Sequence, residues 1–193
     1  MDVTLKSPKE KVQRAKISMM WFAMGSMLMT FAGLTSAYIV SKSRVDWSTQ
    51  YEFPVAFFYS LGVILASSLC FYLGKSFVKK DQQKTATPFF VSSLLLGGLF
   101  AYLQVVGFEQ IIAQGFFPTG SSSTVITSFV YIIVFFHLVH VIAGLLVQTV
   151  VLVNHLRGRY SKDRILGLQL AGMFWHFVDI LWVYLFCFLY FIR

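Results

Sequence analysis

Hydrophobic residues gather along the chain in five long stretches that are almost free of charge. We expect one helix in each stretch, at about residues 17–41, 54–75, 88–110, 124–154 and 164–192. Each stretch exceeds the roughly 20 residues that an α-helix needs to cross a bilayer at about 1.5 Å rise per residue. The pattern therefore predicts an all-α integral membrane bundle of five transmembrane helices, with a basic tail at 1–16 and one membrane domain at 17–193.

Residues that commonly begin helices stand at the predicted boundaries. Ser7 precedes Pro8 and Glu10 in a capping pattern, so we expect the first helix to start within the basic tail. The start signals for the other four helices are Pro54, Thr87 with Pro88, Ser123 or Thr124, and Ser161 with Asp163. The segment 114–123 contains two glycines and a proline and has the composition of a loop.

The overall composition excludes a soluble globular domain. Apolar residues make up 57% of the 193 residues and charged residues 12%, against about 25% charged residues in soluble domains. The mean hydropathy of +0.71 is likewise too high for a soluble domain. The 16 basic and 8 acidic side chains cannot cover a soluble surface, nor is such an apolar chain typical of disorder. Two cysteines are too few for a disulfide framework.

The net charge of +8 follows from where the lysines and arginines lie. Thirteen of the 16 fall in the tail and in two loops on one side of the predicted bundle, and the other side holds Lys42, Arg44 and Arg193. Basic residues mark the cytoplasmic side of membrane proteins, which predicts a cytoplasmic N-terminus and a C-terminus outside. Membrane insertion and anionic lipid account for this charge, so nucleic-acid binding is disfavoured. The first stretch is longer than a signal-peptide core, and no cleaved signal is expected.

Ionisable residues inside the predicted spans are costly and are therefore functional candidates. They are Glu109, His137, His140, His176 and Asp179. Spacings of three residues place the two histidines of the fourth stretch on one helix face, and His176 with Asp179 on another. We expect these residues to form a structural intramembrane polar cluster, in which Asp179 pairs with His176 or His140 and locks two helices together. A proton relay through the same group is the alternative, and Glu109 is expected near the outer surface.

The same residues give weak support for a metal centre. A bis-histidine haem needs ligands from two helices, such as His140 and His176, and a zinc site of three histidines and Asp179 would lack a diagnostic spacing. A di-iron bundle needs Glu-x-x-His on two helices, a motif that this sequence lacks. We therefore predict no catalytic, cofactor-binding or metal-ligating residue in this chain. We expect His155 to be interfacial, and the tryptophans to face lipid or pack.

From these features alone, two classes of function stay open. The first is a small proton-coupled membrane carrier that uses Glu109 and Asp179. The second is a subunit of a larger membrane complex. No paired set of broken helices forms a substrate site, and many hydrophobic faces need partners, which favours the subunit.

A family resemblance emerges at the fourth and fifth stretches. The run Trp175, His176, Phe177, Val178 and Asp179, with Trp182, resembles the terminal helix of subunit III of the haem-copper oxidases. His137 to Gly144, in a His-x-x-His-Val-x-x-Gly pattern, resembles the preceding helix of that family, and Gly107 to Glu109 resembles the end of the helix before that. The segments 66–68 and 31–33 are weaker matches.

This resemblance implies the short, five-helix bacterial form of a subunit whose long form has seven helices. It implies a non-catalytic membrane subunit of a cytochrome c oxidase, without haem or copper of its own, in the bacterial inner membrane. The resemblance further implies that haem and copper belong to partner subunits, that the chain packs on subunit I beside subunit II, and that phospholipid is bound. The implied role is to support the stability and proton uptake of subunit I, and a quinol oxidase is the alternative. One departure is that Ser26 and Met27 stand where the family commonly has a membrane glutamate.

Overall fold

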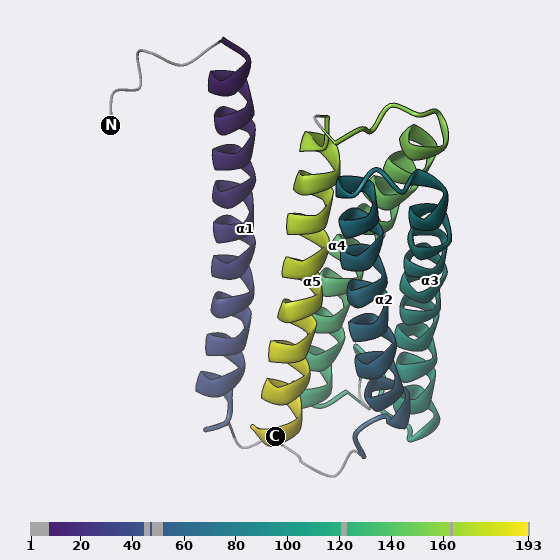
Figure 1. The fold of residues 1–193 in the computed structure, drawn as a ribbon. Helices are drawn as coiled ribbons and strands as arrows, with labels where there is room; N and C mark the ends of the chain where they lie inside the picture. The colour runs from purple at the N-terminus through teal and green to yellow at the C-terminus, as the bar shows by residue number, and fades with distance from the viewer. Residues whose placement is uncertain (1–7, 45–46, 48–51, 121–122, 163, 193) are drawn as a thin grey trace.

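The computed structural model describes residues 8–44, 47, 52–120, 123–162 and 164–192. These residues form five α-helices and no strand, and the helices run alternately up and down (Figure 1). Their bounds are α1 Pro8–Ser41, α2 Val55–Lys79, α3 Gln83–Ala113, α4 Val125–Leu156 and α5 Leu166–Phe191. Each is long and apolar enough to cross a membrane, so the predicted all-α bundle of five membrane-spanning helices is confirmed.

The predicted cap of α4 is confirmed, and it is formed by residues of the same turn. Thr124 caps α4: its hydroxyl accepts a hydrogen bond from the Thr127 amide (3.3 Å), while the Thr127 hydroxyl accepts one from the Thr124 amide (3.2 Å). Pro54 directly precedes α2, as expected. Ser7 and Asp163, which were also predicted caps, lie outside the described residues.

Two predicted helix starts were wrong. Thr87 lies inside α3, which begins at Gln83, and Pro88 lies inside the helix too. Contacts with α4 stabilise this earlier start. His155 Nε2 of α4 lies 3.0 Å from the Thr87 hydroxyl and 3.2 Å from the Gln83 carbonyl. Ser161 does not cap α5 either: Ile165 precedes that helix, and no side chain caps it.

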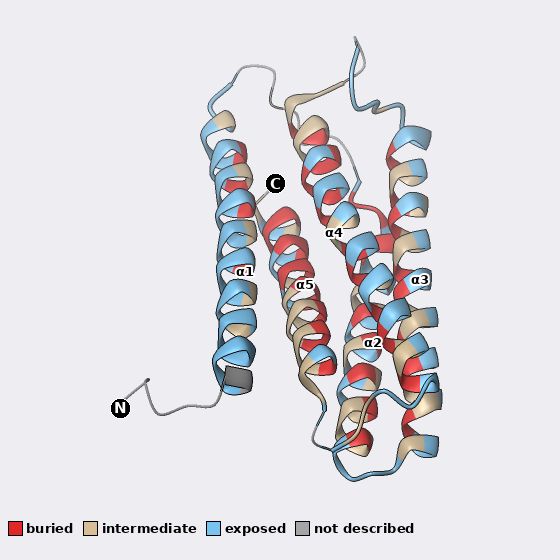
Figure 2. Ribbon diagram, turned by 90° about the horizontal axis from the view of Figure 1, so that it is seen from above, coloured by how far each residue is buried: buried red, intermediate tan, exposed pale blue. Residues whose placement is uncertain are grey.

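Helices α2 to α5 pack as a group, and α1 stands at their side. Helix α1 contacts α4 and α5, and among the described residues it touches neither α2 nor α3. Its buried hydrophobic residues Met24, Phe31 and Tyr38 are seven apart, which is the narrow stripe of a helix with few neighbours. Figure 2 shows the rest of α1 largely exposed, whereas α5 is buried along much of its length.

Bulky aromatic side chains fill the interior. Trp175 and Trp182, seven residues apart on α5, are fully buried. Trp182 contacts Phe57 of α2 edge-on (ring centroids 5.6 Å apart) and Phe100 of α3 (5.4 Å). The interior of the group is therefore a packed core.

Small polar residues join α2, α3 and α4 within this core. The Ser67 hydroxyl donates to the Ser93 carbonyl (2.8 Å), and the Ser93 hydroxyl lies 3.0 Å from the Ser67 carbonyl and 3.3 Å from Gln148 Oε1. Serine and glutamine bond across helices in this way because hydrocarbon offers them no partner.

Candidate functional site

The five ionisable candidates do not form one cluster. His137 of α4 is fully buried and stacks on Trp182 of α5, with ring centroids 5.0 Å apart. Phe31 of α1 and Phe100 of α3 contact its other sides. Neither of its ring nitrogens has a hydrogen-bond partner among the described residues. His137 is thus a packing residue at the meeting point of four helices.

His140, one turn further along α4, faces a different environment. It is partly exposed, and its Nδ1 donates to the carbonyl of Phe136 in its own helix (2.6 Å). Its ring lies 5.7 Å from that of Phe31 on α1. The predicted hydrogen bond between Asp179 and His140 is therefore absent.

His176 links α5 to α2. Its Nδ1 lies 2.6 Å from the hydroxyl of Ser68, and its ring contacts Phe71 edge-on. The alternative predicted pairing, between His176 and Asp179, was also wrong, because His176 takes its partner from α2. The hydrogen bond between His176 and Ser68 therefore joins α5 to α2, and α4 takes no part in it.

Asp179 lies about halfway along α5, one turn beyond His176. It is 1% exposed, and neither carboxylate oxygen has a hydrogen-bond partner among the described residues. The Ser68 hydroxyl lies beside Asp179 and also lies 2.6 Å from His176 Nδ1, so one hydroxyl adjoins both side chains. Asp179 is therefore a carboxyl group buried at the middle of a membrane-spanning helix, which is costly in hydrocarbon.

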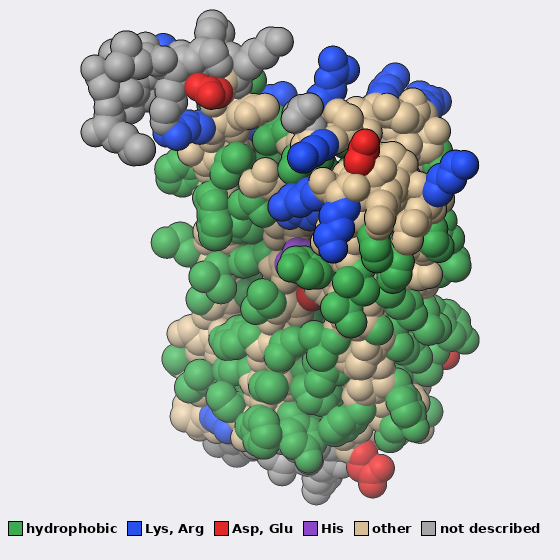
Figure 3. Space-filling view, in the orientation of Figure 1, with side chains coloured by type: hydrophobic (Ala, Val, Ile, Leu, Met, Phe, Trp, Pro, Cys, Tyr) green, Lys and Arg blue, Asp and Glu red, His purple; other side chains and the backbone are tan. Residues whose placement is uncertain are grey.

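Asp179 borders a surface groove between α2 and α5, which we call the α2/α5 groove. It has a volume of about 390 Å³ and is lined by Leu65, Ser68, Leu69, Tyr72, His176, Asp179 and Ile180. In Figure 3 a histidine and an acidic side chain show through among hydrophobic side chains on this face. Lysines and arginines gather towards the end of the molecule that carries the N-terminus.

Glu109 lies apart from the other candidates. It is exposed on α3, four residues before the last residue of that helix. Glu109 does not line the groove that Asp179 borders, so the two carboxyl groups do not share that site.

Sequence reasoning missed the contacts of several interior polar residues. His155, in the last turn of α4, is buried and bonds to the start of α3. Gln104 and Gln148 are buried as well, and the amide group of Gln104 has no hydrogen-bond partner among the described residues. Glutamines carry no charge, so a search for ionisable residues passes over them, although a polar amide inside an apolar stretch is itself a signal.

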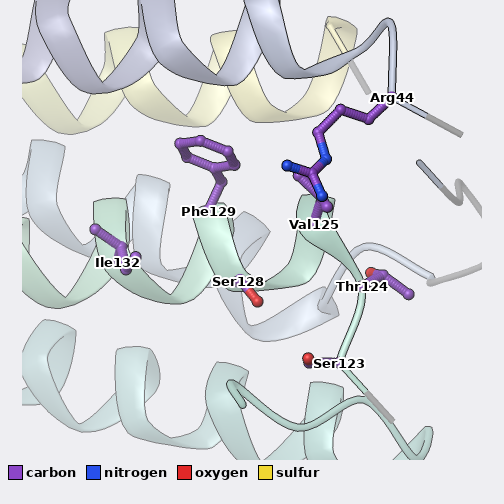
Figure 4. A pocket seen from close by; sticks show the side chains of 7 residues that line it. All are labelled: Arg44, Ser123, Thr124, Val125, Ser128, Phe129 and Ile132. Carbon is purple, nitrogen blue, oxygen red and sulfur yellow. The ribbon is translucent and has the colours of Figure 1, made fainter. Parts of the chain in front are cut away.

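A second hollow, of about 230 Å³, lies beside the first turn of α4. Arg44, which follows α1, reaches over that turn, close to Val125 and the capping residue Thr124 (Figure 4). Phe129 and Ile132 also line the hollow. The basic side chain thus lies at the end of α4 that carries positive partial charge.

In the described ranges, no three His, Cys, Asp or Glu side chains gather in a group that could hold a metal ion. Residues 50–193 match the family model for cytochrome c oxidase subunit III.

Bacterial relatives extend this similarity to most of the chain. The chain is 29% identical over 175 residues to a probable cytochrome c oxidase subunit 3 of Nocardia farcinica, covering 88% of this chain and 84% of the relative. It is 27% identical over 179 residues to a cytochrome c oxidase subunit 3 of Thermostichus vulcanus (90% and 85% covered). The corresponding protein of Bacillus sp. strain PS3 is 28% identical over 177 residues (88% and 82% covered).

Proposed function

This chain belongs to the cytochrome c oxidase subunit III family, and from that premise we propose that it packs on the haem-copper subunit I and supports its stability and proton uptake. The observation that carries the proposal is the family match over residues 50–193, which includes all of α2 to α5. The runs at His137–Gly144 and Trp175–Asp179 lie within it.

The packing of the chain supports a structural role within the oxidase. The interior between the helices is filled by large aromatic rings, and its hydrogen bonds tie one helix to another. Large apolar side chains remain exposed along every helix, and only 11% of the most apolar part of α1 is buried. Such surfaces suit contacts with partner subunits and lipid.

The partners and location form the finer part of the proposal. Haem and copper reside in the partner subunits, subunit II belongs to the same complex, and phospholipid binds to the exposed apolar faces. The complex lies in the bacterial inner membrane with the N-terminus of this chain in the cytoplasm. The bacterial relatives and the placement of thirteen basic residues on one side support this arrangement.

The alternative functions have less support. A quinol oxidase is not favoured, because the relatives above are named as cytochrome c oxidase subunits. A proton-coupled carrier built on Glu109 and Asp179 is not favoured either, since Glu109 is exposed near the end of α3 and does not line the groove that Asp179 borders.

Purification from native membranes tests the proposal. The tagged chain, extracted in mild detergent, should bring down a haem-bearing subunit and a subunit II with a copper-binding cysteine pair. Oxidase depleted of this chain should turn over with slower proton uptake and lose activity sooner, and adding the chain back should restore both. Retention of a stoichiometric metal by the separated chain would contradict the proposal.

A further inference from the structure

The last two turns of α2 carry a small basic hollow, which we call the lysine hollow. It has a volume of about 90 Å³ and is lined by Tyr72, Lys75, Ser76 and Lys79. The two lysines are four residues apart and therefore lie on one face of the helix, where their like charges repel each other. None of the residues that line the hollow is acidic. The lysine hollow therefore favours an anion.

Helix α5 leaves room for one of these lysines. Lys75 is half-buried, and its Nζ atom lies 3.8 Å from the position that a Cβ would occupy at Gly172 of α5. The ammonium group thus lies against a glycine of the neighbouring helix, where a larger side chain would displace it. Lys79, one turn further along α2, is exposed. The positive charge is therefore placed where α2 and α5 meet.

The α2/α5 groove begins at the lysine hollow. Tyr72 lines both, and the exposed side chains of Leu65, Leu69 and Ile180 make the surface of the groove mainly apolar. The helix rises by about 15 Å from Lys75 to Leu65, which is half of the roughly 30 Å of hydrocarbon in a bilayer. The groove therefore extends along one leaflet, with positive charge at its end.

The polar side chains on the floor of the groove do not require a polar occupant. Asp179 is 1% exposed, and the Ser68 hydroxyl adjoins both Asp179 and His176. In Figure 3 the histidine and the acidic side chain are mostly covered by hydrophobic side chains, and lysines and arginines gather above them. An apolar groove that ends in positive charge suits a ligand with an apolar chain and an anionic end.

We propose that the lysine hollow and the α2/α5 groove together bind one anionic phospholipid of the cytoplasmic leaflet. Lys75 and Lys79 hold its phosphate, and an acyl chain lies along Leu69 and Ile180. The inference rests on the proposed function, which places the chain in the inner membrane with this end of α2 in the cytoplasm. Basic pockets between helices on that side are typical sites for anionic lipid headgroups. Phosphatidylethanolamine is a poorer ligand, because the lysines repel its ammonium group.

Photo-crosslinking tests whether the groove holds this lipid. A benzophenone side chain replaces Leu69 in the groove or, as the matched control, Leu95 of α3, which is also exposed and lies at a similar depth. The tagged chain, with the subunits that accompany it, is reconstituted in vesicles of phosphatidylethanolamine with a minor fraction of phosphatidylglycerol. Mass spectrometry should find phosphatidylglycerol in the Leu69 adducts at about five times its bulk fraction, and at its bulk fraction in the Leu95 adducts.

Two results of this experiment would overturn the inference. The first is a lipid composition of the Leu69 adducts that equals the bulk composition. The second is crosslinking of Leu69 to another protein subunit, because a protein would then cover the groove.

Substitution of the lysines tests whether one ligand occupies both the hollow and the groove. Lys75→Gln combined with Lys79→Gln should abolish the enrichment of phosphatidylglycerol at Leu69. Lys84→Gln is the matched control, because Lys84 is exposed at the start of α3 and does not line the hollow. Equal enrichment in the double variant, or equal loss in Lys84→Gln, would contradict the proposed site.

A titration of the full-length chain in mild detergent separates a lipid from a free anion. Native mass spectrometry measures binding of dioleoyl phosphatidylglycerol, whose affinity should fall about fivefold for each of the two lysine substitutions. Inorganic phosphate should not displace the lipid. Displacement by phosphate would show a simple anion site and would overturn the lipid assignment.

The two levels of the proposal fail in different ways. If no oxidase subunit accompanies the native chain but the Leu69 adducts are enriched in phosphatidylglycerol, the proposed function is wrong and the lipid site stands. If oxidase subunits accompany the chain and the Leu69 adducts follow the bulk composition, only the lipid site is wrong.

Discussion

Trp175 fits the bundle because two facing helices carry glycine beside it. A Cβ added at Gly144 of α4 would lie 2.8 Å from two atoms of the Trp175 ring, and one added at Gly97 of α3 would lie 3.0 Å from it. We predict that Gly144→Ala destabilises the bundle, because the indole ring is buried and stiff. Gly98→Ala is the matched control, since nothing lies within 4 Å of its Cβ position.

The magnitude follows from the contact distances. Carbon atoms normally approach no closer than about 3.4 Å, so the ring must withdraw by about 0.6 Å towards α3. Overpacking of this kind costs about 1–3 kcal/mol. Alanine in place of a helical glycine stabilises the helix by about 0.5–1 kcal/mol in both variants. Gly144→Ala should therefore be about 1–3 kcal/mol less stable than Gly98→Ala.

Equilibrium unfolding in mixed micelles measures this difference, and a double-mutant cycle identifies its cause. In a Trp175→Leu background the ring is gone, so Gly144→Ala should lose most of its penalty, with a coupling energy of about 0.5–3 kcal/mol. Equal stability of Gly144→Ala and Gly98→Ala, or strict additivity with Trp175→Leu, would refute the packing argument.

Three further predictions follow from particular side chains, each measured by the same unfolding assay. Ser93→Ala should cost about 1 kcal/mol, because it removes the bonds to Ser67 and Gln148, whereas Ser92→Ala on the exposed side should cost nearly nothing; equal effects would contradict the interhelical bond. Thr124→Val should cost about 1 kcal/mol by removing the cap of α4, against a neutral Thr119→Val in the exposed loop. His140→Phe should change stability by less than about 0.5 kcal/mol and leave oxidase assembly intact, because the hydrogen bond that His140 makes among the described residues is to its own helix; a large loss would restore the predicted polar cluster.

The helices could be predicted from sequence because they are determined by length and hydropathy alone. Five apolar stretches, each long enough to cross a bilayer, leave few alternatives to five membrane-spanning helices. The cap of α4 is equally local, because Thr124 bonds to Thr127, three positions away. The start of α3 could not be predicted in this way, since it depends on His155, which is about 70 positions away in the sequence.

The grouping of the polar residues could not be predicted, because helix rotation depends on packing. His137 and His140 share a helix face at three-residue spacing, yet one turns inward to Trp182 and the other stays partly exposed. Asp179 and His176 likewise share a face, but the partner of His176 comes from α2. Spacing along one helix says which residues are neighbours on it and leaves open which neighbouring helix they meet.

As a non-catalytic subunit of a cytochrome c oxidase, this chain should purify together with the subunits that carry the metal centres. The composition and visible spectrum of the complex purified through a tag on this chain in mild detergent test this directly. We expect stoichiometric haem-bearing and copper-binding subunits in the complex, and no haem absorbance once this chain is separated from them. Purification of the chain free of any oxidase subunit, or with a metal centre of its own, would contradict it.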